Sequence, residues 1–239
     1  MIRRAIKTIL NAGALALCRR EYKKQEFVRF NERPVEYGFL FRHMARLCPR
    51  TVLDIGTGTT ALPHILRHCG CVVTAVDNMR DYWPPGTCNR HFHVIDDDIT
   101  RSQLTGDFDF AVCISVLEHI PDADQAVRHI FRLLAPKGHL VLTFPYTETE
   151  YVKNVYDLPG STYGQDFPFI CQSYSRSDLD RWLTDNGGAL IEQEYWQFWE
   201  GPYWTVGSQI LPPVRADVAS RHQLTCILIE KTASNETSS

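Results

Sequence analysis

The sequence predicts a doubly wound α/β domain, in which helices cover both faces of a mostly parallel sheet. Short apolar runs alternate with segments of helical periodicity from residue 51 onward, and a glycine-rich loop follows the first run. This alternation implies parallel strands joined by right-handed crossovers. The 239 residues, 44% of them hydrophobic, are enough for one domain with a sizeable core. Such sheets bind ligands beyond the carboxyl ends of their strands, so function is sought in those loops.

Seven strands are expected from apolar runs that end at glycine, acidic or turn residues. They cover residues 51–55, 72–76, 91–95, 108–115, 139–144, 190–198 and 224–231.

Helices are expected between these strands. Apolar residues recur at helical spacing over 62–69, and a second stripe runs over 127–134. A third helix is expected to begin at a capping box formed by Ser177 and Asp180 and to end at Gly187.

Composition and cysteine spacing exclude several classes of protein. The net charge of −3 argues against dedicated nucleic-acid binding through phosphate attraction. No apolar run reaches the roughly 18 residues that a membrane span needs. The eight cysteines include no CxxC pair and no Cys/His cluster at zinc spacing, so no disulfide framework and no metal site are expected. We therefore expect a reducing, cytoplasmic environment.

The two ends of the chain differ from the middle. Residues 1–35 are expected to form a basic N-terminal helical segment, because residues 1–30 carry eight basic and two acidic side chains with apolar residues at helical spacing. One interpretation is that residues 1–25 rest on an anionic membrane as an amphipathic helix. The alternative is a helix that packs on the main domain or frays in solvent. Residues 232–239 are polar and are expected to form a disordered tail.

The loop after the first expected strand carries the first functional signal. It reads Asp54-Ile-Gly56-Thr57-Gly58, and glycines here let the chain turn sharply and a ligand approach the backbone. Gly56, Gly58 and Ala61 also fit the dinucleotide-binding pattern GxGxx(G/A). A tight turn without a ligand explains the loop equally well, so the loop alone decides nothing.

Acidic residues end the next two expected strands. Asp77 lies 21 residues after Gly56, where a carboxylate can accept hydrogen bonds from both ribose hydroxyls of a nucleoside, although a solvated turn carboxylate is the alternative. Asp98 can accept from an adenine amino group, and the Ile99 backbone N–H can face a ring nitrogen. Loop and carboxylate together favour a bound adenosine without deciding between NAD and S-adenosylmethionine.

Five motifs in chain order resemble the class I S-adenosylmethionine-dependent methyltransferases. They are DxGxG at 54–58, the acidic strand end at Asp77, DDIT at 97–100, SVLEH at 115–119 and LAPKGHLVL at 134–142. The resemblance covers about residues 36–145 well and the last two strands loosely. The VLEH form is most similar to small-molecule methyltransferases such as those of quinone biosynthesis. The resemblance implies a Rossmann-like sheet of seven strands with a C-terminal antiparallel hairpin, and a methyltransferase domain over 36–231.

Two departures from the family pattern are visible. Thr60 stands where the third glycine of the loop usually lies, a replacement that is common within the family. No Asn/Asp-Pro-Pro-aromatic motif follows the fourth strand, so the resemblance does not extend to the methyltransferases that act on nucleobase amino groups.

The resemblance also implies roles for individual residues around S-adenosylmethionine. Asp77 and Asn78 would hold the ribose, Ser115 would lie beneath the methionine end, and Asp54 would orient the loop or the amino group. The full set of implied cofactor-binding residues is Asp54, Gly56, Thr57, Gly58, Asp77, Asn78, Asp98, Ile99 and Ser115.

His119 is the candidate catalytic base, because imidazole titrates near neutral pH. The alternative is a hydrogen-bonded turn histidine with no catalytic role. Tyr163, Asp166 and His222 are further candidates that nothing in the sequence ranks.

Two aromatic groups follow the fifth strand. The long connection 146–174 is expected to be a substrate-binding lid rather than an excursion that covers the core. The aromatic residues of 195–204 either stack on a ring of the acceptor or pack beneath helices. Residues 81–86 are expected to close over the adenosine.

The predicted function is methyl transfer to a small-molecule or glycan acceptor, with a hydroxyl favoured over nitrogen or carbon. One alternative is an NAD-dependent oxidoreductase, which leaves the motifs at 115–119 and 134–142 unexplained. The other is a non-catalytic binding partner that retains the fold. The sequence does not decide the oligomeric state.

Overall fold

The computed structural model describes residues 2–27 and 29–233, and it divides into two units, residues 1–31 and 32–239. The first unit contains α1 (Ile2–Lys23) and the second contains every other element. None of the helices among the described residues is long and apolar enough to cross a membrane. The tail expected at 232–239 lies outside the described residues from residue 234 onward.

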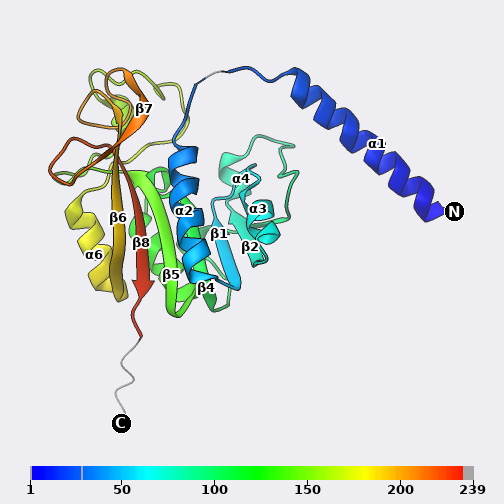
Figure 1. Cartoon of the computed structure of the whole chain (residues 1–239), viewed down its shortest axis with the longest axis horizontal. Helices are drawn as coiled ribbons and strands as arrows, with labels where there is room; N and C mark the ends of the chain where they lie inside the picture. The colour runs from blue at the N-terminus through cyan, green and yellow to red at the C-terminus, as the bar shows by residue number, and fades with distance from the viewer. Residues whose placement is uncertain (1, 28, 234–239) are drawn as a thin grey trace, which may run out of the picture. The chain divides into compact units, whose positions relative to one another are not determined.

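An eight-stranded sheet forms the centre of the second unit, in the order β3-β2-β1-β4-β5-β8-β6-β7 (Figure 1). The first five strands pair in parallel, whereas β8, β6 and β7 pair antiparallel. The doubly wound, mostly parallel fold is therefore confirmed. The strands are β1 Thr51–Ile55, β2 Val72–Asp77, β3 Val94–Asp96, β4 Phe108–Ile114, β5 Leu134–Pro145, β6 Gly188–Trp199, β7 Gln209–Ala216 and β8 Leu224–Lys231.

The eighth strand, β7, is missing from the seven-strand prediction. Its sequence contains Pro212 and Pro213, which argue against a strand because proline donates no backbone hydrogen bond. β7 lies at the edge of the sheet and pairs only with β6, where a strand tolerates proline. The C-terminal antiparallel part is thus a β6–β7 hairpin, with β8 inserted between β5 and β6.

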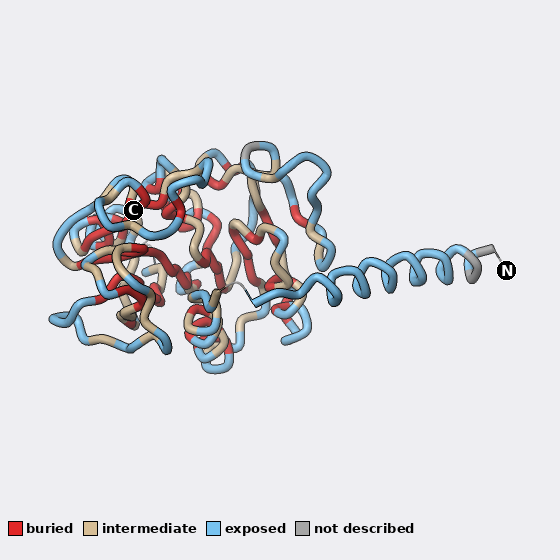
Figure 2. The backbone as a smooth tube through the Cα atoms, turned by 90° about the horizontal axis from the view of Figure 1, so that it is seen from above, coloured by how far each residue is buried: buried red, intermediate tan, exposed pale blue. Residues whose placement is uncertain are grey.

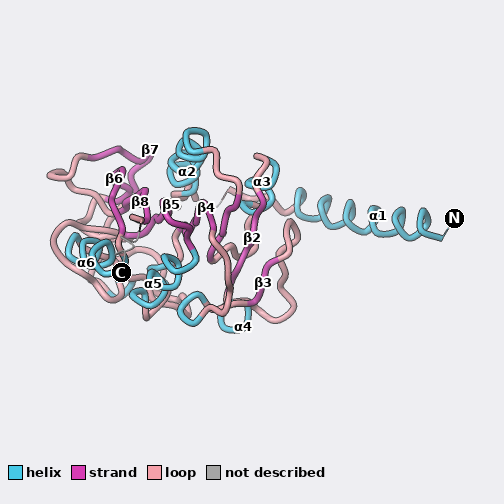
Figure 3. The backbone as a smooth tube through the Cα atoms, turned by 90° about the horizontal axis from the view of Figure 1, so that it is seen from below, coloured by secondary structure: helices cyan, strands magenta, loops and turns pink. Residues whose placement is uncertain are grey.

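Helices cover both faces of the sheet (Figure 3). On one face lie α2 (Arg33–Leu47) and α3 (Leu62–His68), and on the other lie α5 (Ala123–Leu133) and α6 (Arg176–Asn186). Buried residues concentrate along the strands between these layers (Figure 2). Two-sided burial explains why the parallel strands are continuous apolar runs in the sequence. The short elements are α4 Met79–Tyr82, η1 Ile99–Arg101, η2 Leu117–His119 and η3 Val155–Asp157.

Helix α6 uses a different capping box from the expected one. The Ser175 backbone N–H and hydroxyl donate to Asp178 Oδ2 at 3.0 and 2.7 Å, whereas Ser177 and Asp180 lie inside the helix. Both pairs have the S-x-x-D pattern, so the sequence alone does not choose between them. The Tyr174 N–H donates to the Pro145 carbonyl at the end of β5, which ties the chain to the sheet one residue before the cap Ser175. Its predicted end is confirmed, because Gly187 adopts the left-handed conformation that ends a helix.

Much of the second aromatic group is core. Phe198, Trp199 and Trp204 are buried in an apolar cluster that also contains Val155 and Tyr156. Of the two interpretations of residues 195–204, the structure therefore favours packing within the protein over ring stacking on an acceptor.

Candidate active site

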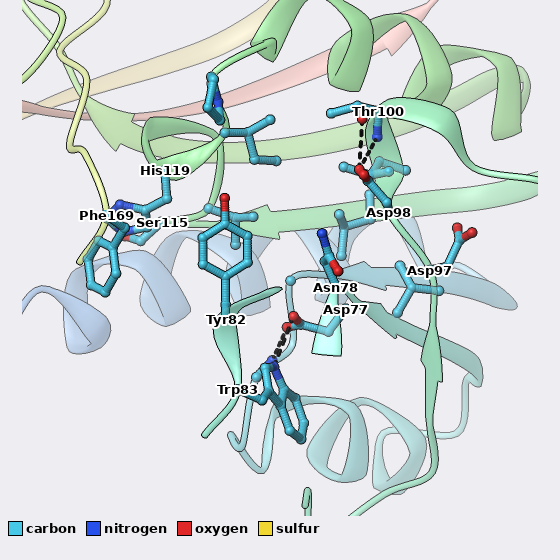
Figure 4. A pocket seen from close by; sticks show the side chains of 18 of the residues that line it. Asp77, Asn78, Tyr82, Trp83, Asp97, Asp98, Thr100, Ser115, His119 and Phe169 are labelled. Carbon is cyan, nitrogen blue, oxygen red and sulfur yellow. Dashed lines mark hydrogen bonds between the residues drawn. The ribbon is translucent and has the colours of Figure 1, made fainter. Parts of the chain in front are cut away.

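A cavity of about 600 Å³ opens where β1, β2, β3 and β4 end, on both sides of the point at which the strand order reverses (Figure 4). His119 lines it, together with seven of the nine expected cofactor-binding residues, namely Gly56, Gly58, Asp77, Asn78, Asp98, Ile99 and Ser115. Asp54 and Thr57 are buried and are not part of the lining. Phe169, from the expected lid 146–174, also lines the cavity, and residues with no predicted role, among them Thr87 and Pro121, complete the wall.

The two glycines of the first loop serve different purposes. Gly56 has φ +68°, and a Cβ atom there would lie 2.4 Å from Val116 Cγ2, so the loop packs directly on the protein. Gly58 has φ +53°, but among the described residues, its two chain neighbours aside, no heavy atom lies within 4 Å of the position that its Cβ would take. The first glycine therefore allows a close turn, and the second leaves backbone open toward the cavity.

Asp77 joins this loop to the end of β2. The Gly58 backbone N–H donates to Asp77 Oδ2 at 2.7 Å, and the Trp83 indole N–H donates to Oδ1 at 3.0 Å (Figure 4). Burial raises the pKa of Asp77, and these two hydrogen bonds oppose that rise by favouring the ionised form. The carboxylate is thus held in one orientation at the cavity wall.

The two adjacent acids after β3 have different partners. Asp98 Oδ1 accepts hydrogen bonds from the backbone N–H and hydroxyl of Thr100, at 3.0 and 2.8 Å, and Asp98 Oδ2 pairs with Arg101 at 3.0 Å. Asp97 also lines the cavity, and its Oδ2 is buried without a hydrogen-bond partner among the described residues. Asp97 was not among the predicted cofactor-binding residues, although the DDIT motif contains both acids and its spacing does not rank them.

Ser115 is held in a strained conformation at the end of β4. Its φ is +50°, a left-handed value that costs a non-glycine residue about 1–3 kcal/mol. The Ser115 hydroxyl donates to Glu36 Oε1 at 2.6 Å, and the Thr143 hydroxyl donates to the same oxygen at 2.6 Å. Glu36 is fully buried, and its other oxygen pairs with Arg33 at 2.6 Å. Helix α2 is therefore pinned to the sheet directly beside the cavity.

The sequence analysis missed Glu36. The available signal was an acidic residue among the apolar positions of a helix that begins with proline at its second residue.

Buried acids beside the loop lack donors. Asp54 Oδ2, Thr57 Oγ1 and Glu118 Oε2 are buried without hydrogen-bond partners in the described part of the chain. Burial raises the pKa of Asp54 to about 7 and that of Glu118 well above its usual range. Asp97 Oδ2 lacks a partner as well, and Asp97 lines the cavity. Buried polar atoms are normally satisfied, so the cavity suits a ligand that carries hydrogen-bond donors, as the amino groups of S-adenosylmethionine do.

His119 has a defined tautomer. Its Nδ1 lies 2.7 Å from the Ile170 carbonyl oxygen and must donate to it, which leaves Nε2 as an acceptor. Burial lowers the pKa of the imidazole, so the ring is neutral at pH 7. The ring contacts Phe169 edge-on, with centroids 4.6 Å apart. Of the other candidate bases, Tyr163, Asp166 and His222, none lines the cavity.

Comparison with known proteins decides the family. A profile described as "Methyltransferase domain" matches residues 22–193, which is more than half of the chain. The chain belongs to the methyltransferase family. The family expected from the five motifs is thus confirmed. This assignment leaves the alternative of an NAD-dependent oxidoreductase without support. S-adenosylmethionine is the cofactor that the family and the unpartnered Asp97 in the cavity wall together indicate.

The relatives of this methyltransferase include enzymes named ubiquinone biosynthesis O-methyltransferase. The one from Pseudomonas paraeruginosa is 27% identical over 162 residues, which cover 60% of this chain and 66% of the relative. The one from Xanthomonas oryzae pv. oryzae is 31% identical over 99 residues, which cover 38% of this chain and 41% of the relative. The matched region therefore spans slightly less than two thirds of the first relative's length.

Solved structures share the fold. The 1,6-didemethyltoxoflavin-N1-methyltransferase of Burkholderia thailandensis superposes with a TM-score of 0.54 and 18% identity, covering 96% of this chain and 90% of that one. The N-methyltransferase NodS of Bradyrhizobium japonicum WM9 superposes with a TM-score of 0.52 and 16% identity, covering 84% of this chain and 87% of that one. Both were crystallised with S-adenosylhomocysteine. At these identities the likeness concerns the architecture alone.

The pKa of Asp54 predicts a pH-dependent affinity. Affinity for S-adenosylhomocysteine is expected to rise about tenfold from pH 6 to pH 8, because Asp54, with a pKa of about 7, loses its proton over this range and only the carboxylate attracts an ammonium group. Calorimetric titration at both pH values measures the rise. Asp54→Asn should flatten the dependence, and Asp185→Asn, an exposed acid on α6, should not. An unchanged slope in Asp54→Asn would assign the pH dependence to another group.

Proposed function

We propose that this methyltransferase transfers a methyl group from S-adenosylmethionine to a hydroxyl of a small-molecule or glycan acceptor. The observation that carries the proposal is His119, whose Nε2 is an unprotonated acceptor at the wall of the cofactor cavity. The name O-methyltransferase borne by the relatives supports an oxygen acceptor. The cofactor supplies a methyl group already activated by a sulfonium, so the protein's tasks are alignment and proton removal.

The residues around the cavity divide these tasks. Asp77 accepts the ribose hydroxyls, with Asn78 next to it. Ile99 and the acids at 97–98 contact the adenine. Ser115, held by Glu36, forms the surface beneath the methionine end, and Asp54 receives the amino group. Each of these assignments uses a polar group that lines the cavity or that lacks a partner beside it.

His119 removes the acceptor proton. The O–H proton of the acceptor would pass to Nε2 while the acceptor oxygen forms its bond to the methyl carbon. The bond from that carbon to the sulfonium sulfur would break in the same step, and S-adenosylhomocysteine would leave. The Ile170 carbonyl holds Nδ1–H and so keeps the ring in the orientation and tautomer that the transfer needs. The base is ready at neutral pH because burial keeps the imidazole uncharged.

The catalytic role of His119 is tested by substitution. His119→Ala is expected to lower turnover about 100-fold or more, because a positioned base contributes on this scale, while affinity for S-adenosylhomocysteine stays within twofold. Wild-type turnover should be level above pH 7 and should fall only below pH 6.5, where the imidazole gains its proton. Release of S-adenosylhomocysteine over a panel of phenols and sugars is the readout.

The matched control is His68→Ala, an exposed histidine at the end of α3. Equal turnover in His119→Ala and the wild type would make His119 a structural turn residue. Tight binding of the cofactor with no turnover on any hydroxyl would favour the non-catalytic binding alternative.

We propose further that residues 146–174 bind the acceptor. Phe169 lines the cavity, and its ring lies 5.1 Å from Phe167, which in turn lies 5.0 Å from Tyr163. Phe167 and Tyr163 are 38% and 39% exposed, so a row of aromatic rings leads from His119 to the surface. The other part of the segment is core, since Tyr146 and Val155 are fully buried.

If this segment binds the acceptor, a substitution within it should change the KM of the acceptor without changing the affinity for the cofactor. Phe169→Ala should raise the KM of the hydroxyl acceptor about tenfold, because an aromatic contact is lost, and should leave affinity for S-adenosylhomocysteine unchanged. Phe27→Ala, in the other unit, is the matched control. An unchanged KM would remove the segment from the acceptor site.

We propose finally that residues 1–25 contact an anionic membrane surface. Helix α1 has no acidic residue in its first turn, and residues 1–30 carry a net charge of +6. The full chain should sediment with phosphatidylglycerol vesicles and not with phosphatidylcholine vesicles. Ile9→Asp, on the apolar stripe, should abolish sedimentation, whereas Asn11→Asp, on the polar side, should only weaken it. Equal loss of sedimentation in both variants would show that charge alone, and not the apolar stripe, holds the helix on the membrane.

A further inference from the structure

The segment between β2 and β3 is tied to the cofactor loop. Asn89 Nδ2 donates to the carbonyls of Gly58 and Thr60, both at 2.9 Å, and Asn89 Oδ1 accepts the His91 backbone N–H at 2.8 Å. Residues 78–93 therefore run from the end of β2 back to the glycine loop, which forms part of the cavity wall. Tyr82 and Trp83, in the middle of the segment, both line the cavity.

Trp83 occupies one hydrogen-bonding position of Asp77. A carboxylate offers about four lone-pair positions, two on each oxygen. The Trp83 indole uses one position on Oδ1, and the Gly58 N–H uses one on Oδ2. The Asn78 backbone N–H also donates to this carboxylate, so one of the four positions remains for a ribose hydroxyl. These donors also prevent the carboxylate from rotating.

We infer that Trp83 is a positioning residue, which holds the Asp77 carboxylate in the orientation that receives the ribose. The inference rests on the proposed assignment of Asp77 to the ribose and extends it to a residue outside the five family motifs. A ribose hydroxyl that takes the remaining position does not displace the indole, so the ribose and Trp83 can bind the carboxylate together.

The fold supports this role at short range. Trp83 follows α4 directly, and its half-buried indole reaches back six residues to Asp77. The turn at 84–87 closes with a hydrogen bond from the Thr87 N–H to the Pro84 carbonyl at 3.0 Å. Proline after the tryptophan restricts the backbone of Trp83 to an extended conformation, which is the one observed.

A double-mutant cycle on the affinity for S-adenosylhomocysteine tests the inference. Calorimetry compares the wild type, Trp83→Phe, Asp77→Asn and the double variant. Trp83→Phe keeps an aromatic ring and loses only the N–H, and it should weaken binding about fivefold. In the Asp77→Asn background the same substitution should have no further effect, because the carboxylate that it orients is absent.

A matched control separates positioning from general loss of an indole. Trp196 donates its indole N–H to Glu194 at 3.1 Å on β6, away from the cavity lining, so Trp196→Phe loses the same kind of bond and should leave affinity unchanged. The Trp83→Phe penalty should also grow toward acidic pH, since the lost donor favoured ionised Asp77. Equal thermal unfolding midpoints for the wild type and Trp83→Phe exclude a folding defect.

Two results would overturn the inference. Unchanged or tighter binding by Trp83→Phe would show that the indole is neutral or competes with the ribose. Full additivity with Asp77→Asn would show that Trp83 acts through packing. Failure of the wild type to bind S-adenosylhomocysteine is a different outcome, which would refute the proposed function itself.

Discussion

The parallel pairing of β1 with β2 on one side and β4 on the other is the constraint on which the site depends. Ile55 at the end of β1 pairs with Val76 and with Cys113, so three strands end at one level. The end of β2 supplies Asp77 of the cavity wall, and the loops after β1 and β4 supply the glycines and Ser115. A shift of one residue in either pairing would turn these side chains to the other face of the sheet.

The cavity combines several features that are unfavourable without a ligand. Ser115 has a left-handed backbone, and buried acids at Asp54 and Glu118 have oxygens without donors. The contacts that Glu36 makes with Ser115 and Thr143 maintain this arrangement. Functional sites commonly contain locally unfavourable features that nearby contacts offset. Here the contacts of Glu36, on α2, provide this stabilisation. A cationic cofactor would provide the missing partners.

Prediction from the sequence succeeds where the signal is local. The strand bounds at 51–55 and 224–231 are reproduced, and the glycine loop, Asp77 and His119 meet at one cavity as expected. It fails where a contact distant in sequence chooses between equal patterns. Two S-x-x-D pairs lie at the start of α6, and the pair that caps it follows directly after the hydrogen bond from Tyr174 to Pro145. β7 is missed because its prolines are tolerated only at a sheet edge.

The sequence by itself determined the strand–helix alternation, the turn at the glycines and the acid at the end of β2, because these depend on neighbouring residues. Only the tertiary structure decided the buried role of Glu36, whose partner Thr143 is 107 residues away, and the free acceptor of His119, which depends on Ile170. It also decided which atoms of the acids at 97–98 already have partners. Periodicity reports which face of an element is buried, whereas hydrogen bonding between elements depends on how they pack.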